Sequence, residues 1–158
     1  ALYSRALVSF LSGVEAIEFS LPLDRATTLA RGVRNEWLLG MCRSLSLATM
    51  SESAAHGGLP SAIDVLGDLL QAGWPTHAWT FGWRLPDLAW SAGLREVAAL
   101  WLGACSASRV PRLLPDPVPA ELAALSDGTS TDARLVREFE RGRAMSFAEL
   151  RAPTLGHA

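Results

Sequence analysis

The sequence predicts an all-α fold of stacked helical hairpins, an α-solenoid. Alanines recur every 36 residues, at Ala26, Ala62 and Ala98, each in a stretch with helical periodicity. Two similar segments, Trp37-Leu-Leu-Gly40 and Trp79-Thr-Phe-Gly82, are each expected to open a long helix. Apolar and polar residues never alternate for five positions with β-branched side chains, so no strand is predicted. Repeats of this size stack to bury their apolar faces, and such arrays mostly serve as binding surfaces.

Three helices are predicted in the first third of the chain. Helical spacing of apolar residues predicts a first helix from Ala1 to about Ser12. Pro22 suits the first position of a helix over 23–33, and Asn35 suits the N-cap of a helix over 36–55. We expect the segment His56-Gly57-Gly58 to end this third helix. The expected apolar sides of the second and third helices are Ala26, Leu29, Ala30 and Val33, and Trp37, Met41, Leu45 and Ala48.

Proline and glycine divide the middle of the chain. Pro60 is expected to start a helix, and the segment 72–75 (Ala-Gly-Trp-Pro) is a sharp stop and restart. A helix over 76–91 follows, which Pro86 should kink or split. After a turn at 92–94, the last repeat helix is expected over 95–107. The apolar stripe of the helix after Pro60 comprises Ile63, Leu66, Leu69 and Leu70.

The composition of the sequence changes after Ser108. Four prolines make 109–119 an extended connector. Short helices are expected over 121–125 and 131–143, with Arg134 and Glu138 paired on the solvated side of the second one. Ser146 and Glu149 form a capping box for a last turn. We therefore divide the chain into a helical-repeat region (1–108), a proline-rich connector (109–119), a C-terminal helical cap (120–152) and a frayed tail (153–158).

Composition excludes several function classes. The 158 residues suit about one domain, with 49% apolar residues and a net charge of −2. All 14 basic residues are arginines, so a phosphate-loop lysine and a lysine Schiff base are both excluded. Cys42 and Cys105 lie in apolar stretches without metal-ligand spacing, which favours buried free thiols in a reducing cytosol, and the alternative is a disulfide that joins them. The longest strongly apolar run, Val97 to Ser108, is too short to span a membrane. Residue 1 is alanine, so we expect a processed chain or a piece of a longer protein.

A tryptophan cluster is the candidate binding site. Trp74, Trp79 and Trp83 lie within ten residues, with His77 between the first two. Aromatic side chains on a solenoid surface can hold an apolar ligand or a peptide helix, and the alternative is that they fill gaps between hairpins. Arg84 could bind a carboxylate or phosphate, or could pair with Asp87.

Catalytic and nucleic-acid sites find little support in the sequence. No serine lies in a Gly-x-Ser-x-Gly segment, and neither His56 nor His77 has a carboxylate at catalytic spacing. Residues 109–158 hold seven arginines but also seven acidic residues, so no basic footprint results. Salt bridges are the simpler interpretation of Arg137, Arg141 and Arg143. We nominate no catalytic residue, metal ligand or cofactor.

Two segments carry a resemblance to a known family. In the first, Leu69-Leu-Gln-Ala-Gly-Trp74 is followed by Trp79, by the dipeptides at 84–85, 88–89 and 92–93, and by the segment 98–104. The second is Phe139-Glu-Arg-Gly-Arg-Ala-Met-Ser146. Together they resemble the C-terminal tetratricopeptide-like repeats of large actinobacterial transcriptional regulators, of the LuxR-type or antibiotic-regulatory kind. The resemblance covers roughly residues 20–152. Pro86 and the proline-rich connector depart from the family's pattern.

The resemblance implies a fold and a function. The fold would be a tetratricopeptide-like α-α superhelix with a C-terminal cap. The chain would be a cytoplasmic, non-enzymatic module that binds a protein partner or small effector, coupled to ATPase and DNA-binding domains outside it. A stand-alone repeat adaptor and a small helical enzyme are the alternatives. We expect that neither nucleic acid nor a membrane binds this chain directly. We also expect self-association through Leu2, Leu7, Phe10 and Leu11 of the first helix.

Overall fold

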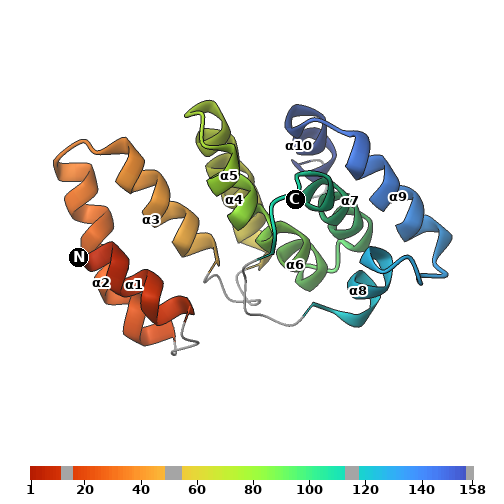
Figure 1. Ribbon diagram of the computed structural model, residues 1–158, viewed down its shortest axis with the longest axis horizontal. Coiled ribbons are helices and arrows are strands. Elements are labelled where there is room, and N and C mark those ends of the chain that lie inside the picture. The colour runs from red at the N-terminus through yellow and green to blue at the C-terminus, as the bar shows by residue number, and fades with distance from the viewer. Residues whose placement is uncertain (12–15, 49–54, 113–117, 156–158) are drawn as a thin grey trace. The chain divides into compact units, whose positions relative to one another are not determined.

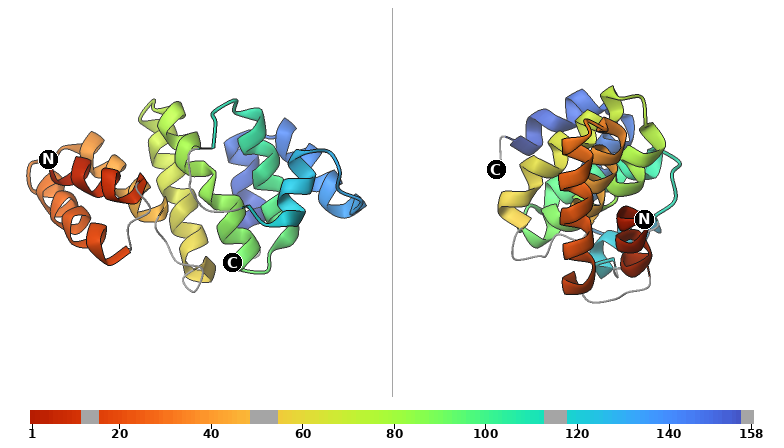
Figure 2. Two further views of the ribbon diagram at one scale, coloured as in Figure 1. Left: turned by 60° about the horizontal axis from the view of Figure 1, so that its bottom comes forward. Right: turned by 90° about the vertical axis from the view of Figure 1, so that its left-hand side faces the viewer.

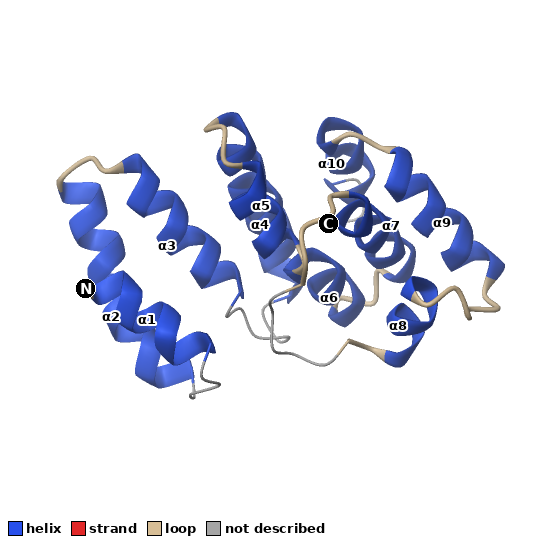
Figure 3. Ribbon diagram, in the orientation of Figure 1, coloured by secondary structure: helices blue, strands red, loops and turns tan. Residues whose placement is uncertain are grey.

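The computed structural model describes residues 1–11, 16–48, 55–112 and 118–155. Within these ranges the chain forms ten helices joined by loops, so the all-α prediction is confirmed (Figure 3). The chain divides into two compact units, which we call unit 1 (Ala1–Met50) and unit 2 (Ser51–Ala158). In the described part, no helix has both the length and the apolar character that crossing a bilayer requires.

Unit 1 is a three-helix unit. It contains α1 (Leu2–Leu11), α2 (Ala16–Gly32) and α3 (Glu36–Ala48), and α2 packs against both of the others (Figure 1). Asn35 is the N-cap of α3, as predicted, because its side-chain oxygen accepts a 2.9 Å hydrogen bond from the Leu38 N–H. The buried apolar residues of this unit are Ala6, Leu23, Ala26, Ala30, Leu39, Met41, Cys42 and Leu45.

Unit 2 is built around one helix. The unit contains α4 (Ala55–Gln71), α5 (Pro75–Gly82), α6 (Arg84–Ser91), α7 (Arg95–Ala107), α8 (Ala120–Ser126), α9 (Ala133–Ala144) and α10 (Phe147–Leu155). Every residue of α7 from Val97 to Cys105 is buried. A helix that is apolar on all sides must be covered on all sides. α6, α8, α9 and α10 all pack against α7, and both Figure 1 and Figure 2 show it inside this group.

The backbones of α7 and α9 touch at two glycines. A methyl group added at Gly103 would fall on the carbonyl oxygen of Phe139, and one added at Gly142 would fall on that of Leu100. Only glycine allows two backbones to approach so closely. Gly142 belongs to the segment that carried the second part of the family resemblance, and its role here is to bring α9 onto α7.

The C-terminal helix α10 is fastened to the core of unit 2. The predicted capping box opens it: the Ser146 N–H donates to the Glu149 carboxylate at 2.7 Å. The indole N–H of Trp101 donates a 2.9 Å hydrogen bond to the Thr154 hydroxyl, which in turn donates to the Leu150 carbonyl. Both Trp101 and Thr154 are fully buried. The helix therefore continues past Pro153, where the sequence suggested a frayed tail.

Four helices of the two units end in the same turn. After α4, α6 and α8 the chain reverses at Gly73, Gly93 and Gly128, whose φ angles lie between 70° and 81°. Each turn has the paired hydrogen bonds of a Schellman motif, for example from Trp74 N–H to the Leu69 carbonyl. After α2 the same position is held by Arg34 at φ 52°. Left-handed backbone costs a non-glycine residue roughly 1–2 kcal/mol.

Two predicted helix starts are wrong. Pro22 and Pro60 lie inside α2 and α4, which begin at Ala16 and Ala55. Each proline removes only the hydrogen bond to the carbonyl four residues earlier, and both helices tolerate this loss near their N-terminal ends. The segment 56–58 is part of α4 and ends no helix. The predicted end of the third helix, beyond Ala48, lies outside the described residues.

Other helix boundaries agree more closely. α7 spans the predicted 95–107, and the predicted helix over 76–91 is split into α5 and α6 at Trp83, three residues before Pro86. The split has a consequence for the second Trp-x-x-Gly segment, because Gly82 is the last residue of α5. That segment therefore closes a short helix and does not open a long one.

Candidate functional site

The five predicted site residues lie along α5 and its junction with α6. Trp74 is the residue before α5 and is half-buried, as are His77 and Trp79 within the helix. The Trp79 ring covers Gly82, since a methyl group added there would lie 3.3 Å from it. His77 and Trp79 share one short helix and Trp74 directly precedes it, and the role of all three in ligand binding stays a prediction.

Trp83 and Arg84 have structural partners inside unit 2. The indole N–H of Trp83 donates a 2.8 Å hydrogen bond to the Val110 carbonyl, which fastens the α5–α6 junction to the segment after α7. Arg84 is only 9% exposed, and its guanidinium lies 3.8 Å from the Asp87 carboxylate. The alternative interpretation, in which Arg84 is a partner of Asp87, is therefore the one that the geometry matches.

A second guanidinium completes this buried charge cluster. Arg112 donates a 2.8 Å hydrogen bond to Asp87, which is 7% exposed. Cys105 lies close enough for both charges to act on its thiol, but burial dominates and raises the pKa of Cys105. The thiol stays protonated and unreactive at neutral pH. The cluster holds the segment after α7 against α6, which is a structural task.

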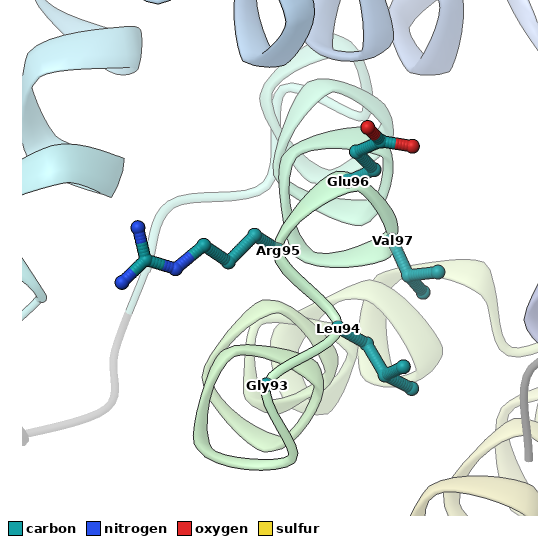
Figure 4. A pocket seen from close by; sticks show the side chains of 5 residues that line it. All are labelled: Gly93, Leu94, Arg95, Glu96 and Val97. Atoms are coloured by element: carbon teal, nitrogen blue, oxygen red, sulfur yellow. The ribbon is translucent and has the colours of Figure 1, made fainter.

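An open hollow lies at the α6–α7 turn. Its volume is about 260 Å³, and it is lined by Gly93, Leu94, Arg95, Glu96 and Val97. Figure 4 shows that these side chains diverge, with Arg95 pointing away from Leu94 and Val97. Arg95 lies over the Trp90 ring at 4.9 Å, and Glu96 pairs with Arg134 at 3.2 Å. A ligand site requires polar groups that converge on one point, and this hollow does not provide them.

The charged residues of α9 pair within unit 2. Glu138 is 8% exposed and lies 2.7 Å from Arg141 and 3.6 Å from Arg137. The predicted Arg134–Glu138 pair is wrong, because Arg134 reaches across to Glu96 of α7. The expectation that Arg137, Arg141 and Arg143 form salt bridges is confirmed.

Sequence reasoning missed an apolar surface in unit 1. Leu29, Val33 and Trp37 were assigned to the core, but they are 59%, 72% and 47% exposed. The buried stripe of α2 consists of Leu23, Ala26 and Ala30, at spacings of three and four residues. Helical spacing alone does not separate Leu29 and Val33 from this stripe, because they lie three residues after Ala26 and Ala30, so the sequence held no local signal of their exposure. We call Leu29, Val33 and Trp37 the apolar face.

The first helix also differs from expectation. Leu2 and Leu7 are half-buried, Ala6 is fully buried, and Val8 is 62% exposed. The side chains of Phe10 and Leu11, on which the self-association prediction also rests, lie outside the described residues.

Both thiols are free and buried, as predicted. In the described residues, no three His, Cys, Asp or Glu side chains gather in a way that could hold a metal ion. The sequence matches no known family model, and neither the curated proteins nor the solved structures include a similar chain.

Proposed function

We propose that this chain is an interaction module of a transcriptional regulator, which binds a protein partner and couples that binding to ATPase and DNA-binding domains outside the chain. The observation that carries the proposal is the unequal burial of large apolar side chains. Six of them are exposed in the described residues, and five of these lie in unit 1. Clustered exposed apolar residues are typical of protein-interaction sites. The six are Val8, Leu21, Leu29, Val33, Trp37 and Val136.

The architecture proposed for the module is a tetratricopeptide-like superhelix. Its support comes from repetition at two levels. The alanines of the 36-residue repeat, Ala26, Ala62 and Ala98, are all buried, in α2, α4 and α7. Four helices end in one type of turn, so the chain reverses direction in the same way at intervals along its length. Helical repeats of this kind present extended surfaces to their partners.

A matched pair of substitutions tests the proposed function in cells. Val33 in unit 1 and Val136 in α9 are both exposed valines in the described residues. We expect Val33→Asp in the chromosomal gene to change the transcript profile in the same direction as deletion of this region. We expect Val136→Asp to leave it as in the wild type, with equal protein abundance in both strains. If deletion of this region leaves the transcript profile unchanged, the regulatory function is wrong and the adaptor alternative becomes the leading one.

A further inference from the structure

The spacing of the apolar face suits one kind of partner. Leu29 lies in the last turn of α2, and Val33 directly follows the helix with its N–H donating to the Leu29 carbonyl, so the two lie on one side. Trp37 follows in the first turn of α3. The corresponding end of α4 differs, because the charged Asp68 holds the position there that Leu29 holds in α2. A short row of apolar anchors on two adjoining helices matches the row that one amphipathic helix presents at i, i+4 and i+7.

Two exposed arginines border the apolar face. Arg25 lies one turn before Leu29 on the same side of α2, and Arg34 follows Val33 directly. Both are exposed, and neither forms a salt bridge with any residue that the structure describes. In unit 2, five of the seven exposed arginines in the described residues pair with carboxylates, namely Arg134, Arg137, Arg141, Arg143 and Arg151.

The net charges of the two units differ in sign. Unit 1 holds five arginines and four acidic residues, whereas unit 2 holds nine arginines and twelve acidic residues. Unit 1 therefore carries a net charge of +1 and unit 2 a net charge of −3.

We infer that the apolar face binds an amphipathic helix of the protein partner that carries acidic residues along its edges. This inference rests on the proposed function and names the chemistry of its partner. Leu29, Val33 and Trp37 take the apolar side of the helix, and Arg25 and Arg34 pair with its carboxylates. An anionic membrane would meet the same arginines, and the vesicle experiment below distinguishes it from a helix.

Synthetic peptides test the inference on the full chain. The probe is a fluorescein-labelled amphipathic helix of roughly 18 residues, or five turns, with a leucine face bordered by glutamates. The control peptide keeps the leucines and replaces each glutamate by lysine. Fluorescence anisotropy should show binding of the glutamate peptide, at least tenfold weaker binding of the lysine peptide, and weakening with added salt.

Single substitutions test whether the peptide binds at the apolar face. Val33→Ser should weaken binding of the glutamate peptide about tenfold, and Val136→Ser should not change it. Arg25→Gln should weaken binding of the glutamate peptide and reduce its salt dependence. Arg34→Gly should also weaken binding while raising the urea midpoint of unit 1, because it relieves the left-handed arginine. All four sites are exposed, so circular dichroism should show an unchanged fold.

The outcomes separate the inference from the proposed function. If both peptides bind equally and Val33→Ser abolishes this binding, the acidic character of the partner is wrong and the apolar face remains an apolar docking surface. Binding of neither peptide, with Val33-dependent flotation on phosphatidylglycerol vesicles, would replace the peptide by a membrane. Binding of neither peptide nor vesicles would overturn the inference, and the chromosomal Val33→Asp experiment then decides the regulatory function separately.

Discussion

The indole of Trp101 and the hydroxyl of Thr154 form a buried hydrogen bond that joins residues 53 positions apart. Trp101 lies in the central helix of unit 2, and Thr154 lies near the end of α10. Because a buried indole N–H needs an acceptor, this bond favours the docking of α10 on α7.

We expect Thr154→Val to lower the free energy of unfolding of unit 2 by about 1–3 kcal/mol, because it leaves the Trp101 N–H buried without an acceptor. Thr154→Ser keeps the hydroxyl and should cost less. Urea unfolding followed by tryptophan fluorescence measures both. Equal destabilisation by serine and valine would show that packing, and not the hydrogen bond, holds α10.

Gly103→Ala and Gly142→Ala should each destabilise unit 2 by about 3 kcal/mol or more, since the added methyl meets a backbone carbonyl that cannot rotate away. Gly32→Ala is the control, because a methyl group there meets nothing within 4 Å. It should leave stability unchanged or raise it. Thermal unfolding of the three variants tests the close approach of α7 and α9, which a tolerated alanine at either position would contradict.

Tyr3 should make unit 1 sensitive to alkali. Burial raises the pKa of Tyr3 from 10.0 to about 12. The unfolded chain therefore loses the phenolic proton first, so stability is fully present below pH 10 and is lost as the pH rises toward 12. Tyr3 is the only tyrosine, so phenolate absorbance titrates it directly.

Tyr3→Phe should remove part of this alkaline loss. The phenolic oxygen has no hydrogen-bond partner in the described structure, so the substitution should cost little stability at pH 7. Urea midpoints at pH 8 and pH 11 measure the difference between wild type and variant. An identical midpoint shift in both proteins would mean that Tyr3 is not the group responsible.

Asp87→Asn should destabilise unit 2 by about 3 kcal/mol, because it removes the carboxylate that faces the Arg84 and Arg112 guanidiniums in a buried setting. Glu140→Gln is the matched control, since its pair with Arg143 is exposed on both sides. We expect no measurable change from it. Urea unfolding compares the two variants, and equal effects would show that burial of the Asp87 cluster contributes nothing.

Local signals in the sequence predicted much of the secondary structure. Asn35, Pro75, Gly73, Gly93 and Ser146 act within one turn of the backbone, and each marks a helix boundary in the structure. The close contact between α7 and α9 was beyond reach, because it depends on which helices meet and not on the sequence around either glycine. The salt-bridge partners of Glu138 were also beyond prediction, because they depend on the burial of its side chain in the folded unit.

The candidate site was less predictable than the fold. Trp83 and Arg84 suggested a ligand site because aromatic and guanidinium groups bind ligands, yet each has a partner inside unit 2. The exposed Trp37 carried no local mark to distinguish it from a core residue at helical spacing. Exposure depends on the neighbours that a helix has, and one sequence does not specify those neighbours.

The central position of α7 affects how the protein folds during its synthesis. As the chain leaves the ribosome, α7 emerges before α8, α9 and α10, the helices that come to cover it. Its nine consecutive buried residues, Val97 to Cys105, then meet water or a chaperone until α8, α9 and α10 have also emerged. Unit 2 thus completes its native core only after α10 has been synthesised, and a premature stop within α9 or α10 would yield a nascent chain prone to aggregation and proteolysis.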